Sequence, residues 1–70
     1  MYFKRLKDLR IDNDLTQKEL ADKFGISQQT LSDYEKGKYD LPNELLIKYA
    51  DFFTVSVDYI LERTDNKKVL

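Results

Sequence analysis

The sequence predicts an all-α domain built from five short helices, and two observations support this prediction. Apolar residues recur at intervals of three and four through most of the chain, as they do on the buried side of a helix. Hydroxyl side chains that can cap helix starts stand just before three of these stretches: Thr16, Ser27 and Ser56. With 70 residues, 41% of them hydrophobic, the chain is long enough for one domain with a small core.

The first helix is expected over Tyr2–Asp12. Its buried stripe should be formed by Tyr2, Leu6 and Leu9. Arg10 follows this stripe directly, so its side chain should face partly inward. Asn13 and Asp14 both tolerate turn conformations, and we expect them to end the helix.

The second helix has the clearest start signal in the chain. Thr16 and Glu19 form a capping box, in which each side chain accepts a hydrogen bond from the backbone amide of the other residue. The helix should therefore begin at Gln17. Gly25 supplies the left-handed conformation that ends a helix, so the second helix should stop just before it.

Ser27 caps a third helix after a break of only two residues. Two short helices joined so tightly cannot lie antiparallel and must cross steeply, which is the helix-turn-helix arrangement. Ala21 is small where the two helices should approach most closely. The apolar side of the pair should consist of Leu20, Ala21, Phe24, Ile26, Leu31 and Tyr34.

A fourth helix is expected over Asn43–Phe53, after a loop that ends at Pro42, a favoured first helical residue. Its buried face should be formed by Leu46, Tyr49, Ala50 and Phe53, with Leu45 and Phe52 beside that face. Thr54 follows at a position where helices favour glycine or asparagine. If Thr54 takes the left-handed conformation there, its β-branched side chain is strained.

Ser56 caps a last helix that should run to about Glu62, with Val55, Ile60 and Leu61 closing the core. Residues 1–62 are therefore expected to form the domain. Residues 63–70 are polar apart from the last two and are expected to be a flexible tail or the start of a linker.

The outward side of the third helix carries polar side chains that suit DNA. Helical spacing places five of them on one face: Gln28, Gln29, Ser32, Asp33 and Lys36. Amides near a helix N-terminus, with lysines further along, suit insertion into a major groove, where a glutamine can pair with both N6 and N7 of adenine. Phosphate would repel Asp33, although its carboxylate can accept from cytosine N4.

This segment resembles the helix-turn-helix of phage lambda-repressor and Cro-type regulators, and the similarity runs from about Leu6 to about Leu61. The resemblance implies a lambda-repressor-like DNA-binding domain. It implies base-reading roles for Gln28, Gln29, Ser32 and Asp33. It implies phosphate contacts for Gln17, Ser27, Lys36 and Lys38.

The resemblance also implies a salt bridge between Arg10 of the first helix and Glu35 of the third. The spacing agrees with this, because Glu35 lies four residues beyond Leu31 and therefore faces the interior. A carboxylate in that position needs a partner.

The formal net charge of −1 is unusual for a DNA-binding domain, which commonly carries a basic excess. Residues 1–38 carry eight basic and seven acidic residues, so the helix-turn-helix half is only slightly positive. This balance argues against tight non-specific binding, but not against a specific site.

Composition also excludes several classes of function. The chain contains no histidine and no cysteine, and it has no metal-ligand cluster or phosphate-binding glycine loop, so we expect no enzyme, metal site or cofactor. No apolar run approaches membrane-spanning length, and charges come too early for a signal peptide. A cytoplasmic protein without a membrane partner or a small-molecule ligand is expected.

The sequence thus predicts a transcriptional regulator, a repressor, that binds a palindromic DNA operator as a homodimer. Dimer contacts are expected around the last helix, near Val57 and Ile60. The alternative is a helical adaptor or antitoxin-like module that uses the same fold to grip a protein. The acidic balance and four aromatic residues expected at the surface keep this alternative open: Phe3, Tyr39, Phe52 and Tyr59.

Overall fold

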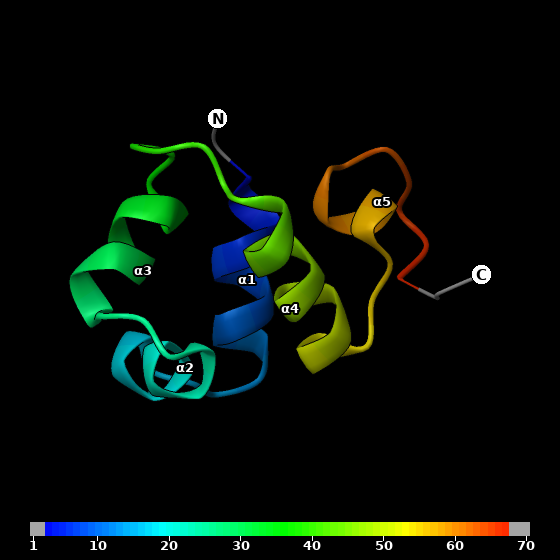
Figure 1. Cartoon of the computed structure of the whole chain (residues 1–70). Coiled ribbons are helices and arrows are strands. Elements are labelled where there is room, and N and C mark those ends of the chain that lie inside the picture. The colour runs from blue at the N-terminus through cyan, green and yellow to red at the C-terminus, as the bar shows by residue number, and fades with distance from the viewer. Residues whose placement is uncertain (1–2, 68–70) are drawn as a thin grey trace.

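The computed structural model describes residues 3–67, and its regular structure in that range is helical throughout. The helices are α1 (Lys4–Asp12), α2 (Gln17–Phe24), α3 (Gln28–Glu35), α4 (Asn43–Phe53) and α5 (Val57–Ile60). In Figure 1, α1 and α4 occupy the centre, the α2–α3 pair lies on one side, and α5 lies on the other. The prediction of an all-α fold with five short helices is confirmed.

The helix-turn-helix unit forms through the local signals that the sequence contains. The Thr16 hydroxyl accepts from the Glu19 amide at 3.1 Å, and the Glu19 carboxylate accepts from the Thr16 amide at 3.0 Å. Gly25 ends α2 at φ 70°, a conformation that costs glycine little. The Ser27 hydroxyl then accepts from the Thr30 amide at 3.1 Å and starts α3.

The core lies between α1, α4 and the α2–α3 pair. The largest side chains that are completely buried are Tyr49, Leu6, Leu20, Leu31 and Ile60. The Tyr49 ring meets Phe24 edge-on, with ring centroids 4.8 Å apart. Burial also raises the pKa of the Tyr49 hydroxyl, which has no hydrogen-bond partner among residues 3–67. Burying each of the large aliphatic side chains stabilises the fold by roughly 1.5–3 kcal/mol.

The start of the first helix was placed too early. Phe3 is extended, with φ −114° and ψ 95°, so α1 begins at Lys4 instead of Tyr2. The expected contribution of Tyr2 to the core lies outside the described residues. Leu6 and Leu9 are buried as predicted, and Arg10 is only 9% exposed.

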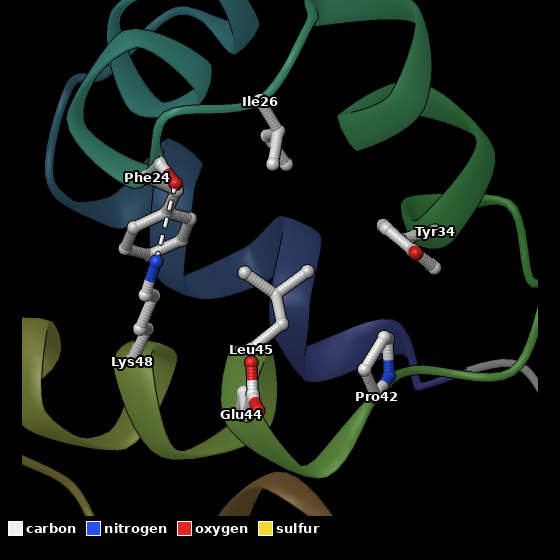
Figure 2. A pocket seen from close by; sticks show the side chains of 7 residues that line it. All are labelled: Phe24, Ile26, Tyr34, Pro42, Glu44, Leu45 and Lys48. Atoms are coloured by element: carbon white, nitrogen blue, oxygen red, sulfur yellow. Dashed lines mark hydrogen bonds between the residues drawn. The ribbon is translucent and has the colours of Figure 1, made fainter.

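The buried face of α4 is rotated relative to the predicted one. Leu45 is buried at 6% exposure, whereas Leu46 and Phe53 are only partly buried at the edge of the core. Figure 2 shows the reason: Leu45 points into the space between Ile26 and Tyr34, where the α2–α3 pair approaches α4. Adjacent leucines fit either face of the helix, so their pattern alone cannot choose between the two.

The fourth helix has the predicted bounds, Asn43–Phe53, although Pro42, with ψ 147°, caps it instead of being its first helical residue. The last helix ends at Ile60 instead of about Glu62, since Leu61 caps it and Glu62 has φ 60°. Val55 and Ile60 are buried, while Leu61 is half-buried.

Arg5 of α1 binds both α5 and the segment that follows it. Its Nη1 donates to the backbone oxygens of Tyr59 at 2.8 Å and Thr64 at 2.6 Å, and its Nη2 donates to the Asp65 carboxylate at 2.7 Å. The guanidinium also lies 4.2 Å from the centre of the Tyr59 ring. The Ser56 amide donates to the Lys67 oxygen at 2.9 Å. Up to residue 67 the chain therefore folds back on the domain, and the division at residue 62 stays a prediction.

Arg10 connects three helices through one buried side chain. Its Nε donates to Oε2 of Glu35 at 2.7 Å, its Nη2 donates to Oε1 at 3.2 Å, and its Nη1 donates to the Leu15 oxygen at 2.9 Å. The Arg10 and Glu35 side chains are 11% and 2% exposed. The ion pair thus joins α1 to α3 and to the residue before the cap of α2.

We expect Arg10→Ala to destabilise the domain by about 3–5 kcal/mol, because it leaves the Glu35 carboxylate buried without its partner. The double variant Arg10→Met with Glu35→Leu removes both charges and should recover much of that loss. Denaturant unfolding of the three proteins tests this. Equal stability of Arg10→Ala and wild type would contradict it.

Thr54→Gly should raise the melting temperature. Thr54 has φ 54° and ψ 49°, a left-handed conformation that costs a β-branched residue on the order of 1 kcal/mol. Glycine removes this strain but gives the unfolded chain more freedom, so the net gain should be about 0.5 kcal/mol. Thermal melts measure it, with Thr54→Ala as the control that keeps the Cβ atom. A glycine variant that melts below the alanine variant would show that strain is absent.

Candidate nucleic-acid interface

The first turns of α2 and α3 meet at an open hollow of about 390 Å³. It is lined by Gln17, Gln28, Gln29 and Ser32. Gln17 is the first residue of α2, Gln28 and Gln29 are the first two of α3, and Ser32 follows one turn later. The structure therefore brings together four of the site residues that the sequence singled out, and the capping residues Thr16 and Ser27 fix both helix starts.

The two α3 glutamines differ in what they contact. Gln28 is exposed, and its side chain makes no hydrogen bond within residues 3–67. The Gln29 amide donates to the Asp33 carboxylate one turn later, at 3.0 Å. This bond holds the Asp33 carboxylate along the helix surface and leaves one N–H and the oxygen of the Gln29 amide open. Of the two glutamines, Gln28 therefore has the freer side chain.

Ser27 already uses its hydroxyl to cap α3. The oxygen accepts from the Thr30 amide and lies 2.7 Å from the Thr30 hydroxyl. A phosphate contact from Ser27 would have to share this oxygen or use the backbone amides at the start of the helix. Exposed amides at a helix N-terminus favour anions, so this end of α3 suits a phosphate without the hydroxyl.

Lys36 and Lys38 lie at the other end of α3 from the hollow. Lys36 is the residue that caps the helix, eight residues beyond Gln28, and a helix rises about 12 Å over that length. Both lysines are exposed, and the Lys38 ammonium lies 5.5 Å from the centre of the Tyr39 ring. The glutamines and the two lysines therefore lie at opposite ends of α3.

One contact of the site was not foreseen. The Gln17 amide donates to Oε1 of Glu35 at 3.1 Å, so a residue expected at the phosphate is bound to the buried ion pair. The two residues are 18 positions apart in the sequence. The sequence predicted that Glu35 faces inward and that Gln17 stands at a helix start. Neither prediction identified the other residue as the partner.

A second hollow, of about 180 Å³, lies between α2, α3 and α4 and is shown in Figure 2. Its lining is mainly apolar, with Glu44 and Lys48 at its edge, and the Lys48 ammonium donates to the Phe24 oxygen at 3.4 Å. Large apolar side chains that are exposed elsewhere on the described surface are Ile11, Tyr39, Ile47 and Phe52. A module that binds another protein would use such a hollow or such exposed apolar side chains.

Comparison with known proteins gives a consistent family. The helix-turn-helix family model matches residues 6–60. The chain is 43% identical over 63 residues to the uncharacterized HTH-type transcriptional regulator MJ0272 of Methanocaldococcus jannaschii. The aligned region covers 90% of this chain and 96% of that protein. It is 35% identical over 57 residues to the CTXphi phage transcriptional repressor RstR of Vibrio cholerae, covering 81% of this chain and 51% of the repressor.

A third relative is named as an antitoxin and not as a transcriptional regulator. The chain is 43% identical over 63 residues to the antitoxin PezA of Streptococcus pneumoniae, covering 89% of this chain and 40% of the antitoxin. The chain thus matches nearly all of MJ0272, but only about half or less of RstR and PezA. Among the described helices, none has the length and apolar character needed to cross a membrane.

The capping box should make the stability of the helix-turn-helix depend on pH. Hydrogen bonds from Thr16 lower the pKa of Glu19 below its ordinary value of 4.5. A carboxylate with a lowered folded pKa stabilises the fold above its unfolded pKa, and this contribution is lost as the pH falls through the folded value. The melting temperatures of wild type and Glu19→Gln should therefore differ at neutral pH and converge in acid. A difference that is the same at every pH would contradict this.

Proposed function

Because the chain belongs to the Cro-type helix-turn-helix family of transcriptional regulators, we propose that it binds double-stranded DNA sequence-specifically, with α3 in the major groove. The observation that supports this most directly is the hollow that Gln17, Gln28, Gln29 and Ser32 line together. Amides and hydroxyls with open donors and acceptors are the groups that read base edges.

The positions of these side chains suggest a division of roles. Gln28 and Gln29 at the start of α3 read bases, with Ser32 and Asp33 one turn further along the same face. Gln17, the N-terminal amides of α2 and α3, Lys36 and Lys38 contact phosphates on either side. The phosphate contacts fix the register of the domain on the duplex, and the base contacts supply the sequence preference.

The operator is proposed to be palindromic and bound by a homodimer, with half-sites about 34 Å apart. One unit of this size offers limited contact, and two-fold symmetry doubles it. The end of the molecule that carries α5 lies opposite α3 (Figure 1), so it can pair without covering the reading helix. Ile60 is completely buried and cannot contribute surface to a dimer, which leaves the half-buried Val57 as the candidate contact.

We propose repression as the outcome of binding, since the relative RstR is named a transcriptional repressor. The rival function, a protein-gripping antitoxin-like module, is favoured by the match to PezA and by the second, mainly apolar hollow. The dependence of DNA binding on salt concentration distinguishes the two functions. DNA binding through phosphates weakens steeply as salt rises, whereas a module that only grips a protein gives no sequence-selective shift of DNA.

Selection of bound duplexes from a random DNA pool, followed by sedimentation of the complex, tests the proposal as a whole. We expect one enriched motif with two related halves and two chains on each duplex. Enrichment of a single unrepeated half-site with one chain bound would contradict the dimer. A pool without any enriched motif would contradict sequence-specific binding and would favour the rival function.

Two substitutions should distinguish contacts to bases from contacts to phosphates. Gln28→Ala removes both hydrogen bonds of a glutamine–adenine pair, so it should weaken binding to the selected operator by about 1–3 kcal/mol and leave scrambled DNA almost unchanged. Lys38→Ala removes a phosphate contact. It should weaken both duplexes alike and reduce the slope of log affinity against log salt by about one unit.

The measurement is a titration of both variants on both duplexes at several salt concentrations. Lys23→Ala is the matched control for charge, because its ammonium lies near the Phe52 ring, outside the α2–α3 hollow. An unchanged ratio of specific to non-specific affinity in Gln28→Ala would show that α3 does not read bases.

A further inference from the structure

The buried ion pair and the proposed DNA site share one atom. Oε1 of Glu35 accepts from Nη2 of Arg10 at 3.2 Å and from Nε2 of Gln17 at 3.1 Å. The Glu35 side chain is only 2% exposed, whereas Gln17 reaches the surface and lines the hollow with Gln28, Gln29 and Ser32. A side chain of the interior therefore holds a side chain of the interface.

The chemistry of the pair decides how the Gln17 amide is oriented. Arginine keeps its proton in proteins, and a carboxylate bound to it by two hydrogen bonds is ionised and can only accept. The group of Gln17 that faces Glu35 must then be the NH₂, which leaves the amide oxygen and the second N–H for the hollow. An amide fixed before binding loses less conformational entropy when a duplex arrives.

We propose that Glu35 is a positioning residue for DNA recognition, because it holds the Gln17 amide at the edge of the α2–α3 hollow in the orientation that a duplex meets. This inference rests on the proposed function. It assigns Glu35 two separable properties: the charge that Arg10 needs for stability, and the acceptor oxygen that Gln17 needs for its orientation. A purely structural Glu35 would have only the first.

A matched pair of variants isolates the acceptor oxygen. Arg10→Met with Glu35→Gln and Arg10→Met with Glu35→Leu both lack the ion pair, and both leave the Leu15 oxygen without the Arg10 donor. They differ in whether residue 35 offers an oxygen to Gln17. Each is also made with Gln17→Ala, which completes a double-mutant cycle.

Affinity is measured for the full chain on the duplex that wild type selects from the random pool, well below every melting temperature. We expect the Glu35→Gln member of the pair to bind about tenfold more tightly than the Glu35→Leu member, which corresponds to one hydrogen bond. With Gln17→Ala present, the two should bind equally. Their stabilities should not follow this order, since the Glu35→Leu member gains apolar packing.

Equal affinities of the two members, together with a loss of affinity in Gln17→Ala alone, would overturn the positioning role and leave the proposed function intact. If neither Gln17→Ala nor Gln28→Ala changes operator affinity, the proposed function itself fails. NMR of the free proteins gives a second readout. The Gln17 side-chain NH₂ signals should exchange slowly in wild type and in the Glu35→Gln member, and rapidly in the Glu35→Leu member; equal exchange in all three overturns the inference.

Discussion

The arrangement of α1, α2 and α3 depends on the Arg10 guanidinium. It donates to Glu35 on α3 and to the Leu15 oxygen just before α2, and the Leu15 amide donates back to the Arg10 oxygen at 3.1 Å. α2 and α3 have eight residues each, too few to be stable alone, so their crossing must be fixed by contacts with the rest of the domain. Apolar packing tolerates sliding, whereas a forked guanidinium with three fixed acceptors does not.

The same interaction shapes the electrostatics of the candidate interface. Glu35 is an acidic group on α3, but it is buried and paired with Arg10. The Asp33 carboxylate is engaged by the Gln29 amide. The face proposed to meet DNA therefore presents amides, a hydroxyl and a few lysines in place of a broad basic patch. Such a face releases few counterions, so its affinity should depend on base contacts more than on phosphate charge.

Local signals predicted the helix-turn-helix unit well, because Thr16, Glu19, Gly25 and Ser27 each act on backbone groups within three or four residues. The prediction of a family resemblance over about residues 6–61 is confirmed by the match to residues 6–60. The error in the buried face of α4 arose because that face depends on distant packing. Leu45 and Leu46 have the same apolar character, and only the α2–α3 pair against α4 decides which one is buried.

Apart from the Arg10–Glu35 pair, the contacts between residues far apart in sequence were not predicted. The bonds of Arg5 to α5 and to the segment after it join residues 54 to 60 positions apart, and nothing near Arg5 indicates them. The bond between Gln17 and Glu35 is of the same kind. For the candidate site, residue types and helical spacing named the side chains that line the hollow. They could not show that one of these side chains is held by the interior.

This bond gives a physical reason for a charged pair in a small core. A buried ion pair can often be replaced by well-packed apolar residues without loss of stability, so stability alone does not explain why a domain would keep one. Apolar side chains at positions 10 and 35 could fill the same space, but they would offer no acceptor to the amide at the start of α2. The Glu35 carboxylate has enough lone pairs to serve Arg10 and Gln17 together. The ion pair holds that carboxylate in place, and the carboxylate in turn binds the Gln17 amide at the surface that we propose as the DNA interface.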